Sequence, residues 1–208
     1  MHVIKALNWR YSVKQFSDHK LSQWQLDELL EATRLSPSSY GLQPYKILVI
    51  SSQTLRERLV PFAFSQQQVS SSSHLLVFAT RTDINTSLVD EYVSLASTKK
   101  GASPDSLAGY AEMAKSAING MTKAQRDQWA QQQTFVALGN MLTSAAMMEI
   151  DTCPIGGFEP DAFDRVLGLK AQQLTTTVIC PIGRRDPSDK YGHYEKVRFD
   201  KNHLVMEQ

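Results

Sequence analysis

Residues 36–44 read Ser-Pro-Ser-Ser-Tyr-Gly-Leu-Gln-Pro, and they separate a helix-like segment from the apolar run 45–50. Pro37 fixes its own φ and biases Ser36 away from the helical region. We therefore expect the next two serines to lie on a turn, where hydroxyl and backbone N–H groups can bind a ligand. The alternative is a plain Ser-Pro turn that ends a helix.

Helix and strand signals lie on both sides of this turn. Ser22, followed three residues later by Gln25, is a capping-box pattern, and apolar residues then recur at helical spacing up to the Ser-Pro break. Short apolar runs at 45–50, 75–79 and 175–180 predict buried central strands. The organisation is mixed α and β with no internal repeat and no long linker, so we expect one domain over residues 1–208.

The middle of the chain predicts helices. Residues 87–133 contain Pro104 and Gly109 and otherwise indicate interrupted helices, whereas residues 134–150 indicate one strongly apolar helix. Its apolar residues include Met141, Leu142, Ala145, Ala146 and Met148. So much apolar surface needs a large partner, which could be a second chain or the core of this one.

Two compact cationic clusters lie near the ends of the chain. Arg10-Tyr11-Ser12-Val13-Lys14 is the first and Lys196-Val197-Arg198 the second. Arginine offers a planar fork of donors suited to phosphate and lysine a mobile charge, so the two clusters could converge on one phosphorylated cofactor. Ordinary solvated surface charge is the alternative.

Composition narrows the possible classes. The chain has 208 residues, 42% of them hydrophobic, with 22 Lys and Arg against 21 Asp and Glu. It can build a core, and it has no net field to attract nucleic acid or an anionic membrane. No stretch approaches the roughly 18 apolar residues of a membrane span, and the first residues lack a signal-peptide core, so we expect a cytoplasmic protein.

Metal and disulfide chemistry have little support in the sequence. Cys153 and Cys180 show no C-x-x-C pairing, and the five histidines show no metal-ligand spacing. Buried free thiols and no metal site are the expectation.

Four short motifs occur in order at compatible spacing. They are Arg10-x-Ser12-x-Lys14-x-Phe16, residues 36–44, Pro154-Ile155-Gly156-Gly157, and Lys196-Val197-Arg198. Together they resemble the nitroreductase family over nearly the whole chain. The resemblance implies an α+β fold with a central, mostly antiparallel sheet surrounded by helices, and a homodimer. A long central helix would lie at the dimer interface, and a C-terminal extension would embrace the partner subunit.

The resemblance also implies the cofactor FMN and roles for the cationic clusters. Arg10, Lys196 and Arg198 would hold the FMN phosphate, with Tyr11 and Ser12 close by. Lys14 would lie near the N1 and O2 edge of the flavin, where negative charge accumulates on reduction, and would raise the reduction potential.

The turn Pro154-Ile155-Gly156-Gly157 would run along one face of the flavin ring, with the N–H of Gly156 or Gly157 directed at N5. Many family members carry Glu where Gly156 stands, so this chain lacks that carboxylate. Gln68 stands where better-known members have Lys, and it could still donate a hydrogen bond to the pyrimidine.

The loop with Pro37, Ser38 and Ser39 would reach the flavin bound mainly by the other subunit, which makes the site intersubunit. Gln43-Pro44 at matching spacing favours this function over a plain turn. Gln133 aligns with a glutamine near the flavin of the opposite subunit. Candidate substrate-pocket residues are Tyr40, Tyr110 and Met121, the last two within a variable lid at residues 87–128.

The implied activity is FMN-dependent reduction of flat acceptors such as nitroaromatics and quinones by NADH or NADPH, with ping-pong kinetics. The flavin would perform the hydride transfer, so no catalytic side chain is expected. No G-x-G-x-x-G follows a strand, which disfavours a separate nicotinamide domain. The alternatives are an electron carrier, a flavin-binding module, or a dehalogenase-like or flavin-fragmenting relative.

Overall fold

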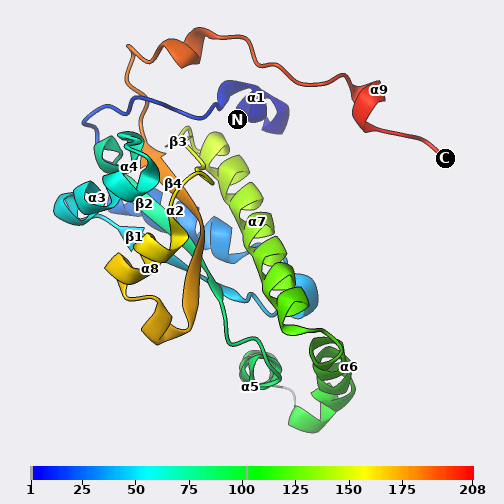
Figure 1. The fold of residues 1–208 in the computed structure, drawn as a ribbon. Helices are drawn as coiled ribbons and strands as arrows, with labels where there is room; N and C mark the ends of the chain where they lie inside the picture. Colours follow the sequence, from blue (N-terminus) through cyan, green and yellow to red (C-terminus); the bar gives the residue numbers. More distant parts are fainter. Residues whose placement is uncertain (1, 102) are drawn as a thin grey trace.

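A four-stranded antiparallel sheet forms the centre of the structure, a computed structural model that describes residues 2–101 and 103–208 (Figure 1). Its strand order is β1-β2-β4-β3. The strands are β1 (Tyr45–Ile50), β2 (His74–Arg81), β3 (Asp151–Thr152) and β4 (Leu174–Gly183). The α+β fold with an antiparallel sheet is therefore confirmed.

The three predicted strands are present, but one prediction about them is wrong. The apolar run 45–50 was expected to be a buried central strand, whereas β1 lies at an edge of the sheet and only Ile50 is buried in it. Apolar composition alone cannot distinguish an edge strand from a central one, because sheet position depends on long-range pairing.

Helices cover both faces of the sheet, and β2 shows why. Alternate side chains of a strand point to opposite faces, so Leu75 and Val77 enter one core cluster while Leu76 and Phe78 enter another. The first cluster packs under α3 (Gln53–Leu59), α4 (Gln68–Ser71) and α8 (Pro160–Leu167). The second packs under α2 (Gln23–Arg34) and α7 (Lys123–Met147).

The remaining helices lie beyond the two ends of the sheet (Figure 1). At the lower end in the view are α5 (Ser87–Lys100) and α6 (Ala108–Asn119), which confirm the interrupted helices predicted for residues 87–133. At the upper end lie α1 (Val3–Trp9) and the C-terminal segment with α9 (Lys201–Leu204). Short 3-10 turns occupy Ser39–Gly41, Val60–Ala63, Pro104–Leu107, Lys170–Gln172 and Lys190–His193.

The long helix differs from its prediction in extent and in what it buries. It begins at a Thr122–Gln125 capping box and ends at Met147, whereas residues 134–150 were predicted. The helix begins at Lys123, eleven residues before the start predicted from hydrophobicity, because the capping box precedes the strongly apolar part. The apolar residues singled out from the sequence pack inside this chain. Met141, Ala145 and Ala146 are buried, and Leu142 and Met148 pack against the core cluster that contains Met141 and Ala145.

A different part of α7 presents apolar side chains to solvent. Phe135 is 52% exposed and Val136 45% exposed. The C-terminal segment, red in Figure 1, runs away from the body of the chain and also carries exposed apolar residues. They include Val197, Phe199, Leu204 and Met206. No helix among the described residues is long and apolar enough to cross a membrane.

Candidate functional site

The first cationic cluster lies beside β3 at one end of the sheet. Ser12 forms a parallel bridge with Thr152, and the Val13 N–H donates to the Thr152 carbonyl at 3.2 Å. Because Thr152 is followed at once by Cys153 and the turn 154–157, this pairing aligns residues 10–14 with that turn. Two motifs that are about 140 residues apart in the sequence therefore become neighbours.

The second cationic cluster crosses the first and closes a pocket. A cavity of about 430 Å³ is lined by residues 8–12 and 14 and by residues 191, 192 and 194–198. Arg10, Tyr11, Ser12, Lys14, Lys196 and Arg198 all line it. The convergence of the two clusters, expected from the sequence, is therefore present within one chain.

The cations in this pocket repel one another. Burial, followed by the proximity of Arg198, lowers the pKa of Arg10. Burial also lowers the pKa of Lys196, and Arg10 and Arg198 lower it further. Such mutual lowering indicates a positive potential that an anion would relieve.

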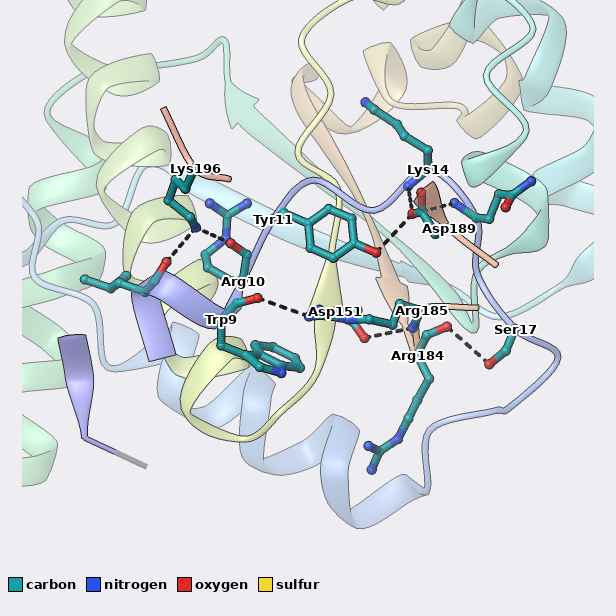
Figure 2. A network of polar contacts seen from close by, with 12 residues as sticks. Trp9, Arg10, Tyr11, Lys14, Ser17, Asp151, Arg184, Arg185, Asp189 and Lys196 are labelled. Atoms are coloured by element: carbon teal, nitrogen blue, oxygen red, sulfur yellow. Dashed lines mark hydrogen bonds and ion pairs between the residues drawn. The ribbon is translucent and has the colours of Figure 1, made fainter. Parts of the chain in front are cut away.

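Unused donors in the same pocket suit an anion. Arg10 Nε is buried and has no hydrogen-bond partner among the described residues. Lys196 Nζ donates to the carbonyls of Leu7, at 2.7 Å, and Arg10 (Figure 2). An ammonium has three N–H donors, so one remains for a ligand. Arg198 Nη1 donates to the Val197 carbonyl at 2.5 Å, and the other N–H groups of this guanidinium have no partner in the part of the chain that the structure describes.

Lys14 connects this pocket to a second one. The second cavity, of about 640 Å³, is lined by Lys14 and Gln15, by residues 65–68 and by residues 188–191. Lys14 Nζ lies 4.0 Å from the sulfur of Cys153, whose pKa is raised by burial. Gln68, predicted to contact the pyrimidine, is buried within the wall of this second cavity.

The turn 154–157 lies next to the second cavity, to which Gln66 connects it. Ile155 is held to Ile179 by two backbone hydrogen bonds of 2.8 and 3.2 Å, and Gln66 Nε2 donates to the Gly157 carbonyl at 2.9 Å. Gly156 is exposed, and a Cβ added there would meet no described atom within 4 Å. The space above this backbone is therefore open to a ligand.

The remaining predicted residues form a second cluster at the opposite end of the sheet. Gln133 Oε1 accepts a hydrogen bond from the Ser39 N–H at 2.8 Å, and the Tyr110 hydroxyl donates to the Tyr40 carbonyl. The hydroxyl of Ser38 accepts from the Gln43 N–H at 3.1 Å, and Pro37 precedes it in the same loop. Met121 packs against the same apolar cluster as the two tyrosines.

The two clusters lie far apart within one chain. The loop 37–43 leads into Tyr45, which pairs with Thr80, whereas Thr152 lies level with Ile182 and His74. Six residues of β2 separate these levels, which is about 20 Å at the rise of an extended strand. The loop therefore does not reach the cationic pocket of its own chain.

A network of charged residues that the sequence analysis missed supports the first cluster (Figure 2). The Arg185 guanidinium lies 4.1 Å from the Trp9 ring centroid and 4.6 Å from that of Tyr11, and pairs with Asp151 at 2.6 Å. Asp189 accepts hydrogen bonds from Tyr11 and Lys14. These carboxylates had no sequence signal, because their partners Arg185, Tyr11 and Lys14 lie 34 to 178 residues away.

Comparisons with known proteins agree with this arrangement. Residues 7–184 match the family model described as "Nitroreductase family". A protein of Staphylococcus epidermidis named "Putative NAD(P)H nitroreductase" is 33% identical, with 98% of this chain and 95% of that protein covered. A similarly named protein of Staphylococcus saprophyticus is 31% identical, with 98% and 95% covered.

Solved structures share the fold. A Bacillus subtilis protein described as "putative nitroreductase ydfN" superposes with a TM-score of 0.88 at 22% identity, covering 99% of this chain and 98% of that one. A protein of Exiguobacterium sibiricum described as a nitroreductase in complex with FMN gives 0.85 at 21% identity, covering 100% and 98%. The order of motifs, the antiparallel sheet and the match over residues 7–184 together show that this chain belongs to the nitroreductase family.

Proposed function

We propose that this chain, as a single domain over residues 1–208, is an FMN-dependent oxidoreductase that uses NADH or NADPH to reduce flat small-molecule acceptors such as nitroaromatics or quinones. The observation that carries the proposal is the pocket in which Arg10, Lys196 and Arg198 converge without saturating their donors. The names of the relatives and the FMN complex of one structural neighbour support the same reading.

The residues present fit FMN from end to end. The three cations, with Tyr11 and Ser12, would hold the phosphate, because fork-like and charge-assisted donors suit phosphate oxygens. Lys14, on the boundary between the two pockets, would supply positive charge near the pyrimidine.

The uncharged walls would receive the ring. Gln68 and the open backbone at Gly156 and Gly157 would offer hydrogen bonds to the ring. The neighbouring segment Pro154-Ile155, whose Ile155 backbone is already bonded to Ile179, would form the wall beside it. FMN, when bound, would supply hydride transfer from the nicotinamide to the acceptor. The protein residues orient the reactants and set the local charge.

We further propose a homodimer with intersubunit sites. The loop with Pro37, Ser38, Ser39 and Gln43 lies about 20 Å from the cationic pocket of its own chain, so it would contribute to a flavin site only through a second copy. Exposed Phe135 and Val136 on α7, together with the extended C-terminal segment, supply apolar surface for such contacts. The partner's loop would bring Gln133, Tyr40, Tyr110 and Met121 with it.

A visible absorption spectrum of the purified protein tests cofactor and class together. We expect flavin bands that bleach when NADH or NADPH is added without oxygen and return when a quinone or nitroaromatic is added. Double-reciprocal plots of the initial rate against the NADH or NADPH concentration, at several fixed acceptor concentrations, should give the parallel lines of ping-pong kinetics. Flavin that NADH and NADPH fail to reduce would indicate a flavin-binding module, and reoxidation only by a protein partner would indicate an electron carrier. Either result would refute the proposed activity.

A further inference from the structure

The carboxylate of Asp189 fills a nest of N–H and O–H donors. It is 2% exposed. Oδ2 accepts from the Lys14 N–H at 2.8 Å, the Gln15 N–H at 3.1 Å and the Tyr11 hydroxyl at 3.1 Å, and Oδ1 accepts from the Tyr191 N–H at 3.1 Å. Successive backbone amides that point at one anion form a concave site of the kind that usually binds phosphate. Here the protein's own carboxylate occupies it.

These contacts hold together the two segments that lie between the first and the second cavity. Lys14 and Tyr191 are residues that line both cavities, and Asp189 accepts hydrogen bonds from the backbone of each. Figure 2 shows Asp189 between Tyr11 and Lys14, with the Lys14 side chain directed away from it. None of the ion pairs among residues 2–101 and 103–208 includes Asp189. Its contacts with Lys14 therefore act on the backbone and not on the ammonium.

Charge and burial make these contacts persistent. Burial alone would raise the pKa of Asp189, but the hydrogen bonds from Lys14, Gln15, Tyr191 and Tyr11 together lower it below its ordinary value. Hydrogen bonds to an ionised, buried acceptor are stronger than those between neutral groups. The segment 11–15 is thus anchored to the C-terminal segment at the point where its lysine projects.

We propose that Asp189 is a positioning residue for the flavin site, which fixes the backbone of Lys14 and thereby the place of its ammonium. This inference rests on the proposed function, in which Lys14 stabilises the reduced flavin. Asp189 also lines the second cavity, but both of its carboxylate oxygens accept hydrogen bonds from the protein. We therefore assign it no contact with cofactor or substrate, and it acts through Lys14.

The sign of a potential shift tests the proposal. Asp189→Asn removes the charge and replaces one acceptor with a donor, so the anchoring weakens. If Asp189 acts through Lys14, the midpoint potential of bound FMN falls, in the same direction as in Lys14→Met and by no more than in that variant. In a Lys14→Met background Asp189→Asn then has no further effect. A direct effect of the lost negative charge would raise the potential instead, and that result, or an unchanged potential, would overturn the proposal.

Amide hydrogen exchange on the flavin-free protein gives a second readout. We expect the Lys14 and Gln15 amides to exchange at least about tenfold faster in Asp189→Asn than in the parent, because they lose a charge-assisted acceptor. Asp186→Asn is the matched control, since among residues 2–101 and 103–208 the Asp186 side chain bonds only to Ser188 on the same segment. Unchanged exchange at Lys14 and Gln15 would overturn the proposal.

If Asp189→Asn does not fold, Asp189→Glu takes its place, because it keeps the charge but displaces the carboxylate by one methylene.

The two measurements also separate the role of Asp189 from the proposed function. A parent protein that binds no FMN would refute the proposed function, and amide exchange would still decide whether Asp189 holds Lys14.

Discussion

Removing cations from the shared pocket should weaken FMN binding and leave riboflavin binding unchanged. Arg10 and Arg198 line the pocket from opposite ends of the sequence, and Arg10 Nε is buried without a partner among the described residues. Riboflavin carries the same ring and ribityl chain but no phosphate. The perturbation is Arg10→Ala, Arg198→Ala and the double variant, each titrated with both flavins.

The magnitude follows from the donors that each arginine offers. A hydrogen bond to a charged group contributes about 1.5–3 kcal/mol, and about 1.4 kcal/mol is a tenfold change in Kd. Each single variant should therefore weaken FMN by about one to two decades. The two guanidinium groups lie close enough for Arg198 to lower the pKa of Arg10, so the effects should not simply add.

Quenching of flavin fluorescence on binding measures both dissociation constants. Arg58→Ala, at an exposed position of α3, is the matched control and should change neither. FMN affinity in the parent should also fall as salt is added, because the pocket is open to solvent. Unchanged FMN affinity in the double variant, or equal losses for FMN and riboflavin, would refute the phosphate assignment.

Four further expectations follow from the same structure. Lys14→Met should retain FMN but lower its midpoint potential in a potentiometric titration, and an equal or higher potential would place Lys14 away from the flavin. Phe135→Asp should convert a dimer to monomers that lose FMN, because burying an unpaired carboxylate at the interface costs several kcal/mol. Sedimentation measures the oligomeric state, and a monomeric parent protein that holds FMN would contradict the intersubunit site. Arg56→Met should lower the melting temperature in thermal denaturation, whereas Arg58→Met at an exposed position should not. Arg56 is 1% exposed, and its guanidinium donates to the Ser72 and Ser73 carbonyls at 2.8 and 2.5 Å. Each carbonyl left buried without a donor costs about 1–3 kcal/mol. The lowered pKa of Asp189 contributes to the free energy of unfolding. This contribution should be fully present above about pH 3.8, the ordinary pKa, and should be lost as the pH falls through the lower pKa of the folded state. The free energies of unfolding of the parent and of Asp189→Asn, measured by denaturant titration, should therefore become equal only in strong acid.

Phe135, and not Leu142, is the position on α7 at which an added charge tests association. From the sequence, Leu142 was the natural position for a disruptive charge on the long helix. In the structure Leu142 packs against the core cluster of its own chain. A charge there would unfold the monomer, so it would report on stability and not on association. Exposed Phe135 is the position that separates the two effects.

Local and order-dependent features were readable from the sequence. The capping box at Ser22, the helix that ends before Pro37 and three of the strands depend on short-range patterns, and the structure contains them all. The order and spacing of four motifs indicated the family, which the match over residues 7–184 shows. The convergence of the cationic clusters near the two ends was also predictable, because unpaired arginine and lysine need an anion.

Features that depend on long-range pairing came only from the tertiary structure. The edge position of β1 is one, since an apolar run has the same pattern in any strand of a sheet. A second such feature is which apolar residues of α7 face the core of this chain, such as Met141, and which face solvent, such as Phe135. The distance of about 20 Å between the loop 37–43 and the cationic pocket follows from strand register, which composition does not encode.

The roles of the two carboxylates Asp151 and Asp189 also came only from the tertiary structure. Asp151 and Asp189 look like ordinary surface acids in the sequence, yet in the structure they are 3% and 2% exposed. Asp189 holds the segment that carries the first cationic cluster, and Asp151 holds Arg185, which lies over Trp9 and Tyr11. The partners of Asp189 on that segment lie 174 to 178 residues away. A buried charge needs specific partners, and only the folded chain determines which groups those are.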